Sequence, residues 1–213
     1  MPSQSRADRP ESNVDYQGEV QKLLASSEGH FLLESGHHGE LWLDLELLCL
    51  RPKKIQPLAS ELAGRLKGLD VDAVCGPLNE GAFVALLVAA GLDVDFIYTE
   101  RFANPSKGSL YPVDYRIPSA LRGTIRGRRV AIVNDVINAG SAVRGTFADL
   151  EACHAKIVAI APLLVLGSWT AGFVAQKNIA LHTLASLPNR VWQPDECPLC
   201  ASGVPLVDVA ACP

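Results

Sequence analysis

The chain has 213 residues, of which 48% are hydrophobic and 20% charged, and its formal net charge at pH 7 is −4. This length allows one globular domain with a sizeable core, and the lack of excess Lys and Arg argues against a nucleic-acid-binding scaffold. Because no apolar run is long enough to span a bilayer and no signal segment opens the chain, we expect a cytoplasmic protein that binds neither nucleic acid nor membrane.

The N-terminal part predicts a tail, a short helix and a strand. Residues 1–13 are polar and contain two prolines, so we interpret them as a flexible tail. A helix is expected over residues 16–25, and the alternation of residues 41–45 after a Gly- and His-rich turn suits a strand. A helix is expected after Pro57 and before Gly68, with three leucines on one face: Leu58, Leu62 and Leu66.

The middle of the chain alternates short apolar runs with helical segments. Strands are expected at residues 71–75, 94–98, around Val130 and at 157–166. Helices are expected at residues 82–90, ended by Gly91, and at 141–152. This alternation predicts an α/β protein with a parallel sheet covered on both faces.

Residues 99–128 form a long polar connection rich in Arg, Pro and Gly. Such a connection could be a mobile cover over an active site or an exposed hairpin with solvated charges, and the sequence does not separate the two. If residues 111–117 form a strand, the mobile part shrinks to 104–110.

Residues 129–142 carry the most specific motif. Four apolar residues precede the polar pair Asn134-Asp135, then a turn of small residues leads into a helix that starts near Ser141. A carboxylate beside free backbone N–H groups suits a sugar phosphate, whose hydroxyls need acceptors and whose phosphate needs donors. The alternative is that Asp135 and Ser141 merely cap a strand–helix turn.

This motif is similar to the phosphoribosyl pyrophosphate signature, and the chain resembles the type I phosphoribosyltransferases, most closely the orotate phosphoribosyltransferases. The resemblance covers most of residues 28–206 and includes residues 29–36, 75–81 and 197–206. It implies a type I phosphoribosyltransferase fold, in which helices flank a central parallel sheet and a small N-terminal hood is added. It further implies a single domain from residue 14, with the hood at about 14–50 plus 185–213 and the core at about 51–184.

The resemblance implies transfer of ribose 5-phosphate between phosphoribosyl pyrophosphate and a nucleobase, most closely orotate, giving orotidine 5′-phosphate and pyrophosphate in pyrimidine biosynthesis. It implies Mg²⁺ held by substrate oxygens and water, with no direct protein ligand, and a homodimer. The transition state of this reaction is cation-like at the sugar, so the protein acts mainly by positioning and charge.

The same resemblance assigns roles to individual residues. Catalysis is expected from Asp135 and Asn134. Binding of the phosphate and ribose is expected from Val136, Ile137, Asn138, Ala139, Gly140, Ser141 and Ala142. Binding of pyrophosphate is expected from Leu78, Asn79, Glu80, Gly81 and a cation of the long connection, Arg101 rather than Lys107. The base region is expected at Phe31, Glu34, Ser35 and His37.

Several positions depart from the family pattern. Asn134 replaces an acidic residue, Glu34 stands where the orotate enzymes usually have lysine, and residues 166–170 lack the arginine that pairs with the orotate carboxylate. Two alternatives therefore stay open: a nucleotide-binding regulatory protein that has lost catalysis, or a transferase for another base. Trp169 could stack on a base or pack on the sheet edge.

The six cysteines do not form a disulfide scaffold, and Cys49, Cys75 and Cys153 are expected to be buried thiols. Cys197 and Cys200 have the spacing of half a zinc site, which Cys212 and His182 could complete. The alternative is a structural turn.

Overall fold

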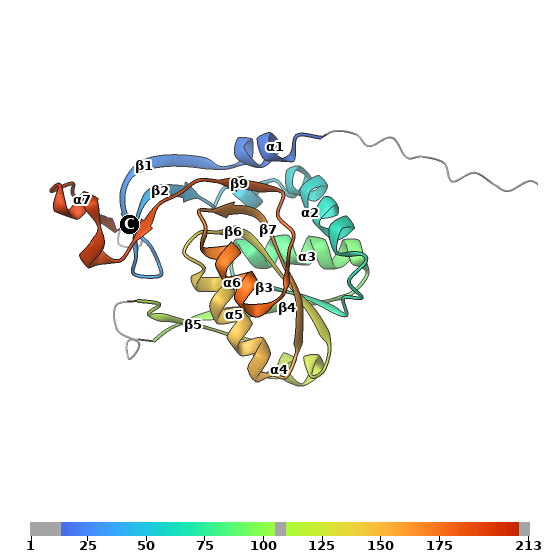
Figure 1. Cartoon of the computed structure of the whole chain (residues 1–213). Coiled ribbons are helices and arrows are strands. Elements are labelled where there is room, and N and C mark those ends of the chain that lie inside the picture. The colour runs from blue at the N-terminus through green and yellow to red at the C-terminus, as the bar shows by residue number, and fades with distance from the viewer. Residues whose placement is uncertain (1–13, 105–109, 209–213) are drawn as a thin grey trace, which may run out of the picture.

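The structure is a computed structural model that describes residues 14–104 and 110–208. The predicted tail at residues 1–13, Lys107 and Cys212 lie outside the described residues. A seven-stranded sheet carries helices on both faces, and a four-stranded sheet lies at one end of the molecule (Figure 1). This arrangement confirms the predicted α/β class, with a mostly parallel central sheet and a small hood.

The central sheet has the order β5-β4-β3-β6-β7-β8, with β9 also paired to β7. Its strands are β3 (Ala73–Pro77), β4 (Asp95–Ala103), β5 (Val113–Arg116), β6 (Arg129–Ile137), β7 (Lys156–Leu166), β8 (Ala180–Leu181) and β9 (Ala185–Leu187). Every pairing is parallel except that of β4 with β5. The parallel strands therefore end together at one edge of the sheet.

Helices cover both faces of this sheet: α2 (Pro52–Leu66), α3 (Glu80–Leu92), α5 (Ser141–Ala152) and α6 (Trp169–Lys177). The first two pack on one face and the last two on the other. Successive residues of β6 alternate between the two cores, because strand side chains point to opposite faces. Ala131 and Val133 lie in the core under α2 and α3, whereas Ile132 lies in the core under α5.

Several predicted helix boundaries are wrong. The first helix ends at Leu23 and not at residue 25. The helix that was expected after Pro57 begins at Pro52 instead, because buried Ile55 extends its apolar face by one turn and Pro52 is suited to the first helical position. The next helix continues through Gly91, where an added Cβ would lie 3.2 Å from Ala63 Cβ, so glycine permits close packing of α2 and α3. That helix runs from Glu80 to Leu92, and Asp93 directly after it adopts the left-handed conformation with φ 57°.

The long connection contains a hairpin. Strand β4 runs on to Ala103, and β5 pairs with it in antiparallel register from Glu100↔Arg116 to Ala103↔Val113. The alternative of a strand within residues 111–117 is thus confirmed, with the strand restricted to Val113–Arg116. The connection continues through the short helices α4 (Ser119–Arg122) and η3 (Gly123–Ile125) before β6.

The hood is built from segments near both ends of the described chain. Its sheet has the order β10-β2-β1-β11 and consists of β1 (Ala25–Leu32), β2 (His38–Asp44), β10 (Val191–Trp192) and β11 (Val207–Asp208). Between the last two strands lie η4 (Pro194–Glu196) and α7 (Pro198–Ala201), at the outer end of the molecule (Figure 1). The remaining elements, α1 (Tyr16–Leu23) and η1 (Leu48–Leu50), flank the central sheet.

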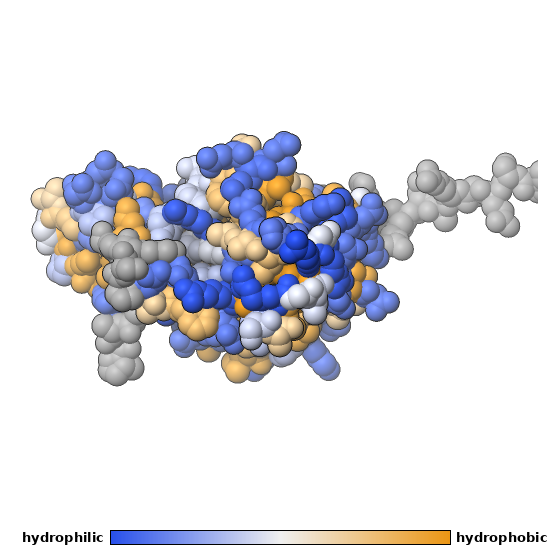
Figure 2. All heavy atoms as spheres, turned by 90° about the horizontal axis from the view of Figure 1, so that it is seen from below, coloured by the Kyte–Doolittle hydropathy of each residue, from blue (hydrophilic) through white to orange (hydrophobic). Residues whose placement is uncertain are grey.

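The surface is mixed in character. Figure 2 shows the face seen from below, on which hydrophilic and apolar side chains are interspersed. Among the described residues no helix is both long and apolar enough to cross a membrane.

Candidate active site

A cavity of about 750 Å³ lies where the hood meets the carboxyl ends of β3 and β6. Ligands of open parallel sheets bind at this edge, because loops and helix N-termini gather there. The walls come from residues 33–35 and 41–46 of the hood, 77–81 after β3, Arg101 and Tyr115 of the hairpin, 134–143 after β6, and Leu166. The loops that follow the neighbouring strands β3 and β6 thus line one cavity, which the hood covers.

The turn between β6 and α5 forms one wall. Gly140 has φ 80°, and the helix begins directly after it, so the first N–H groups of α5 have no acceptor within the helix. The hydroxyl of Ser141 is buried and has no hydrogen-bond partner among the described residues. Free amides at a helix N-terminus beside an unpartnered hydroxyl are hydrogen-bond donors of the kind that suit an anion.

Packing beneath the turn fixes its shape. An added Cβ at Gly140 would lie 2.1 Å from the Trp169 ring, which stacks on Phe173 with centroids 4.9 Å apart. Trp169 therefore packs against the turn and Phe173, rather than on the sheet edge as one alternative expected, and it is absent from the described cavity wall. On the far side of the turn, Asn189 Nδ2 donates to Asn138 Oδ1 at 2.8 Å.

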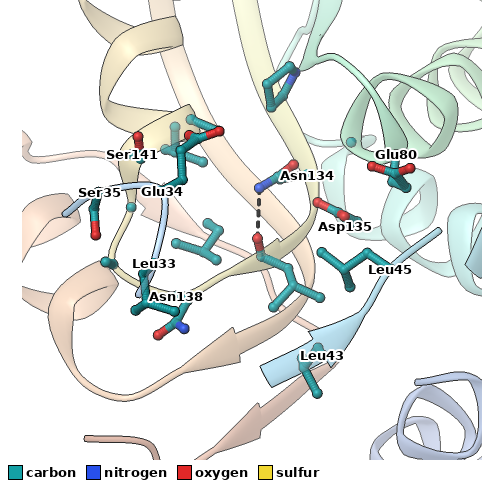
Figure 3. A pocket seen from close by; sticks show the side chains of 18 of the residues that line it. Leu33, Glu34, Ser35, Leu43, Leu45, Glu80, Asn134, Asp135, Asn138 and Ser141 are labelled. Atoms are coloured by element: carbon teal, nitrogen blue, oxygen red, sulfur yellow. Dashed lines mark hydrogen bonds between the residues drawn. The ribbon is translucent and has the colours of Figure 1, made fainter. Parts of the chain in front are cut away.

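Asp135 is only 6% exposed at the end of β6. The pKa of this carboxyl is raised to about 7: burial is the largest cause and the nearby Glu80 adds to it, whereas the backbone N–H groups of Val136 and Asp135 act in the opposite direction. Figure 3 shows Asp135 and Glu80 on one side of the cavity, across from Ser35 and Ser141. A cation or a set of hydroxyl donors in the cavity would stabilise the ionised form.

The side chain of Asn134 contacts both the end of β6 and the start of α3. Its Nδ2 donates to the carbonyl of Val136 at 2.9 Å, and its Oδ1 lies 2.1 Å from where a Cβ on Gly81 would sit (Figure 3). Its side chain is therefore held between the end of β6 and the start of α3. The amide donates to a carbonyl, a contact that an ionised aspartate could not make.

The loop after β3 leads into a second helix N-terminus. Leu78 N–H donates to the carbonyl of Thr99 at 2.9 Å, so its amide is already engaged, and the Leu78–Asn79 peptide bond is cis. Residues Glu80 and Gly81 begin α3 and have no acceptor for their N–H groups within the helix. Two helix N-termini thus face one cavity.

Arg101 and Glu34 meet at the mouth of the cavity, with Nε 2.6 Å from Oε2. The Tyr115 hydroxyl donates to the other carboxylate oxygen of Glu34 at 2.7 Å, and burial together with Glu34 raises the pKa of Tyr115. Tyr115 was not predicted as a site residue. Its only sequence signal is its place in the potential strand at residues 111–117.

The hood contributes a wall that the sequence analysis did not assign. Residues 41–46, including Asp44 and Glu46, line the cavity, and their alternation was the only signal. Of the predicted base-region residues, Glu34 and Ser35 line the cavity, whereas Phe31 packs against Trp42 and is absent from the wall. His37 also lies outside the wall, bonded to Ser35 Oγ at 3.0 Å.

The predicted burial of three cysteines is confirmed for two of them. Cys75 and Cys153 are buried, whereas Cys49 is half-buried. The Sγ atoms of Cys197 and Cys200 lie beside two hood histidines, His30 and His38. His182 is not part of this group, because its backbone follows β8 and bonds to Ile160.

Comparison with known proteins gives the following similarities. The family model described as "Phosphoribosyl transferase domain" matches residues 50–170. The orotate phosphoribosyltransferase of Nitratiruptor sp. is 31% identical over 202 residues, which cover 87% of this chain and 94% of that protein. The orotate phosphoribosyltransferase of Caldanaerobacter subterraneus is 27% identical over 189 residues, or 88% of this chain and 91% of that protein. The crystal structure of orotate phosphoribosyltransferase from Aeropyrum pernix superposes with a TM-score of 0.58 at 22% identity, covering 79% of this chain and 91% of that one.

Proposed function

The chain belongs to the phosphoribosyltransferase family, and we propose that it transfers ribose 5-phosphate from phosphoribosyl pyrophosphate to orotate. The products are orotidine 5′-phosphate and pyrophosphate, in pyrimidine biosynthesis. Relatives named orotate phosphoribosyltransferase match most of the chain, which supports this substrate.

One observation carries the proposal. The amides at the start of α5, the unpartnered Ser141 hydroxyl and the buried Asp135 carboxyl all face one cavity. The amides and hydroxyl are donors for the 5-phosphate, and the carboxylate is an acceptor for the ribose hydroxyls. The second helix N-terminus, at Glu80 and Gly81, is a donor set for the pyrophosphate.

The chemistry requires little from the protein beyond position and charge. The bond from the anomeric carbon to the pyrophosphate oxygen breaks, and that oxygen keeps the electron pair. A ring nitrogen of the base supplies the pair for the new bond on the opposite face and releases its proton to solvent, so the anomeric carbon is inverted. Ionised Asp135 stabilises the positive charge that develops on the sugar, while the helix amides hold both phosphate groups in line.

The charges of the cavity fit a divalent cation that arrives with the substrate. Five carboxylates line the described cavity, at Glu34, Asp44, Glu46, Glu80 and Asp135. Arg101 is the only cationic side chain among the described lining residues. Carboxylates of this kind suit hydrated Mg²⁺, and Asp135 and Glu80 are the pair that would accept hydrogen bonds from its water ligands. Bound with pyrophosphate, Mg²⁺ would neutralise charge on the leaving group.

We also propose a homodimer. Exposed apolar side chains gather around the start of α3 and the neighbouring η1: Leu47, Leu50, Phe83 and Leu86. An apolar surface of this kind is typical of contacts between subunits. Sedimentation of the purified protein should give twice the chain mass, and Leu86→Arg should lower it. The cytoplasmic location remains a prediction from composition.

Release of pyrophosphate tests the activity. The purified chain, Mg²⁺ and phosphoribosyl pyrophosphate are incubated with orotate, uracil, adenine, hypoxanthine or guanine, and Asp135→Asn serves as the control for background hydrolysis. We expect turnover with orotate that depends on Mg²⁺ and is lost in the variant. Turnover with another base alone would contradict the choice of orotate.

Two alternative functions keep specific support. Among the described lining residues, the sole cation is already paired with Glu34, so the orotate carboxylate lacks an unpaired arginine. This favours either another base or a protein that binds nucleotides without catalysis. Calorimetric binding of phosphoribosyl pyrophosphate without turnover of any base would establish the binding protein and contradict the enzyme.

A further inference from the structure

Four potential metal ligands converge in the hood, away from the cavity. They are His30 on β1, His38 at the start of β2, Cys197 directly before α7 and Cys200 within α7. One ligand atom of each residue lies within 4.8 Å of the others. His30, His38 and Cys197 are buried, and Cys200 is exposed.

The spacing of these atoms matches a tetrahedral site. His30 Nε2 lies 3.1 Å from His38 Nδ1, 3.4 Å from Cys197 Sγ and 3.7 Å from Cys200 Sγ. His38 Nδ1 lies 3.3 Å from Cys200 Sγ. Zinc–nitrogen bonds of about 2.0–2.1 Å and zinc–sulfur bonds of about 2.3 Å at tetrahedral angles separate ligand atoms by about 3.3–3.8 Å. The distances between the four ligand atoms are therefore already close to those expected around a bound zinc ion.

The tautomer of His30 also suits metal binding through Nε2. Its Nδ1 lies 2.8 Å from the carbonyl of Val204, to which only an N–H can donate. The proton therefore resides on Nδ1, and the lone pair of Nε2 points at the other three ligand atoms. A backbone carbonyl in this position is the usual partner of a metal-binding histidine.

The C-terminal segment at residues 201–208 makes few other stabilising contacts. Residues 201–208 are all exposed, and β11 has two residues. Cys197, in contrast, is 3% exposed. A segment that buries so little apolar surface needs another source of stability, such as a metal.

We propose that His30, His38, Cys197 and Cys200 bind one structural Zn²⁺ that fastens the C-terminal segment to the hood. Two thiolates and two neutral imidazoles form a closed set of four ligands, typical of a structural site, and the two thiolates balance the charge of the ion. Binding releases the thiol protons to solvent. The same ion fixes the start of β2, the strand that leads to the cavity wall at residues 41–46.

Metal content of the full chain tests the proposal without any assay of activity. The untagged protein is dialysed against metal-free buffer, and its metals are measured by mass spectrometry. We expect about one zinc per chain in the wild type and less than about 0.1 in Cys197→Ser and Cys200→Ser. Cys49→Ser and His154→Asn, which lie outside the cluster, should keep the wild-type content. Wild-type protein without zinc, or full zinc in the cluster variants, would overturn the proposal.

A second measurement avoids reliance on variants that could misfold. Zinc is removed from the wild type with a chelator and replaced by Co²⁺, whose visible spectrum reports ligand number and sulfur coordination. We expect the bands of a tetrahedral site with two sulfur ligands, and a Tm that falls by about 5 °C or more on chelation and recovers on addition of zinc. An octahedral spectrum, or a disulfide between Cys197 and Cys200 in the purified chain, would refute the site. Neither result depends on whether the chain transfers phosphoribose.

Discussion

Arg101 and Glu34 form an ion pair that links β4 to the hood, with 2.6 Å between Nε and Oε2. The pair neutralises the negative charge that Glu34 places at the cavity wall. Both side chains are partly exposed, at 54% and 33%, and the pair contributes little to stability. Its importance is that it sets the direction of the only cation among the described residues of the cavity wall.

Substitutions in this pair should act in opposite directions on the donor. Arg101→Gln removes positive charge near the pyrophosphate, so KM for phosphoribosyl pyrophosphate should rise about 10- to 100-fold. Glu34→Gln releases Arg101 and removes a negative charge, so KM should stay equal or fall, by up to about tenfold. Steady-state kinetics measure both, and Lys177→Gln, whose partner Glu151 lies on the outer surface, is the control. A higher KM in Glu34→Gln would show that the carboxylate itself is needed.

Asp135→Asn should lose activity and gain stability. The variant lacks the charge that opposes the cation-like sugar, and we expect kcat to fall by at least about 100-fold. Burial raises the pKa of Asp135 to about 7, above the ordinary value of about 3.9 in an unfolded chain. The folded state therefore holds a proton that the unfolded state has lost, and the free energy of unfolding falls as pH rises from about 4 to 7.

The isosteric amide removes this penalty, so the Tm difference between variant and wild type should be largest near pH 8 and vanish near pH 4. Thermal unfolding at several pH values measures it. A difference that does not change with pH would show that the carboxyl of Asp135 titrates normally in the folded protein.

The strand–turn–helix at residues 129–152 was predictable because its signals are local. Four apolar residues, a polar pair and a glycine before a helix start lie within a short stretch, and α5 covers the predicted residues 141–152. The cavity wall around Asp135 follows from the same order of residues, since parallel strands end at a common edge. Whether these residues catalyse the reaction is what the variants test.

Contacts between distant segments were not predictable from one sequence. The partners of Cys197 and Cys200 come from β1 and β2, whereas the sequence alone named only Cys212 and His182 as residues that could complete the site. The pair of Arg101 with Glu34 likewise depends on how the hairpin meets the hood. Gly91 could be read as a helix end because its close packing against α2 is invisible until both helices are placed.

The dependence of activity on pH should follow Asp135. If ionised Asp135 accepts the ribose hydroxyls, kcat/KM should fall about tenfold per pH unit below about 7 and level off above it. Burial lowers the pKa of His37, which lies outside the described cavity wall, so its imidazole should not produce this limb. Profiles at constant ionic strength with saturating Mg²⁺ measure it. A profile that is flat from pH 5 to 8 would exclude Asp135 as the titrating group.

Gly140→Ala should disrupt the phosphate turn for two separate reasons. Gly140 has φ 80°, which costs a residue with Cβ about 1–2 kcal/mol, and the new Cβ would lie 2.1 Å from the Trp169 ring. We expect a lower Tm and weaker binding of phosphoribosyl pyrophosphate in calorimetry. Gly172→Ala is the matched control, because nothing lies within 4 Å of its added Cβ inside α6, and it should raise stability by about 0.5–1 kcal/mol.

The double variant Gly140→Ala/Trp169→Ala separates the two causes. It removes the steric conflict and keeps the backbone strain, so donor binding should recover in part while Tm stays low because the Trp169 packing on Phe173 is lost. Full loss of binding in the double variant would assign the defect to the backbone alone. Unchanged binding in Gly140→Ala would mean that the amides of this turn do not hold the phosphate, since that turn could not keep its shape with the added methyl group.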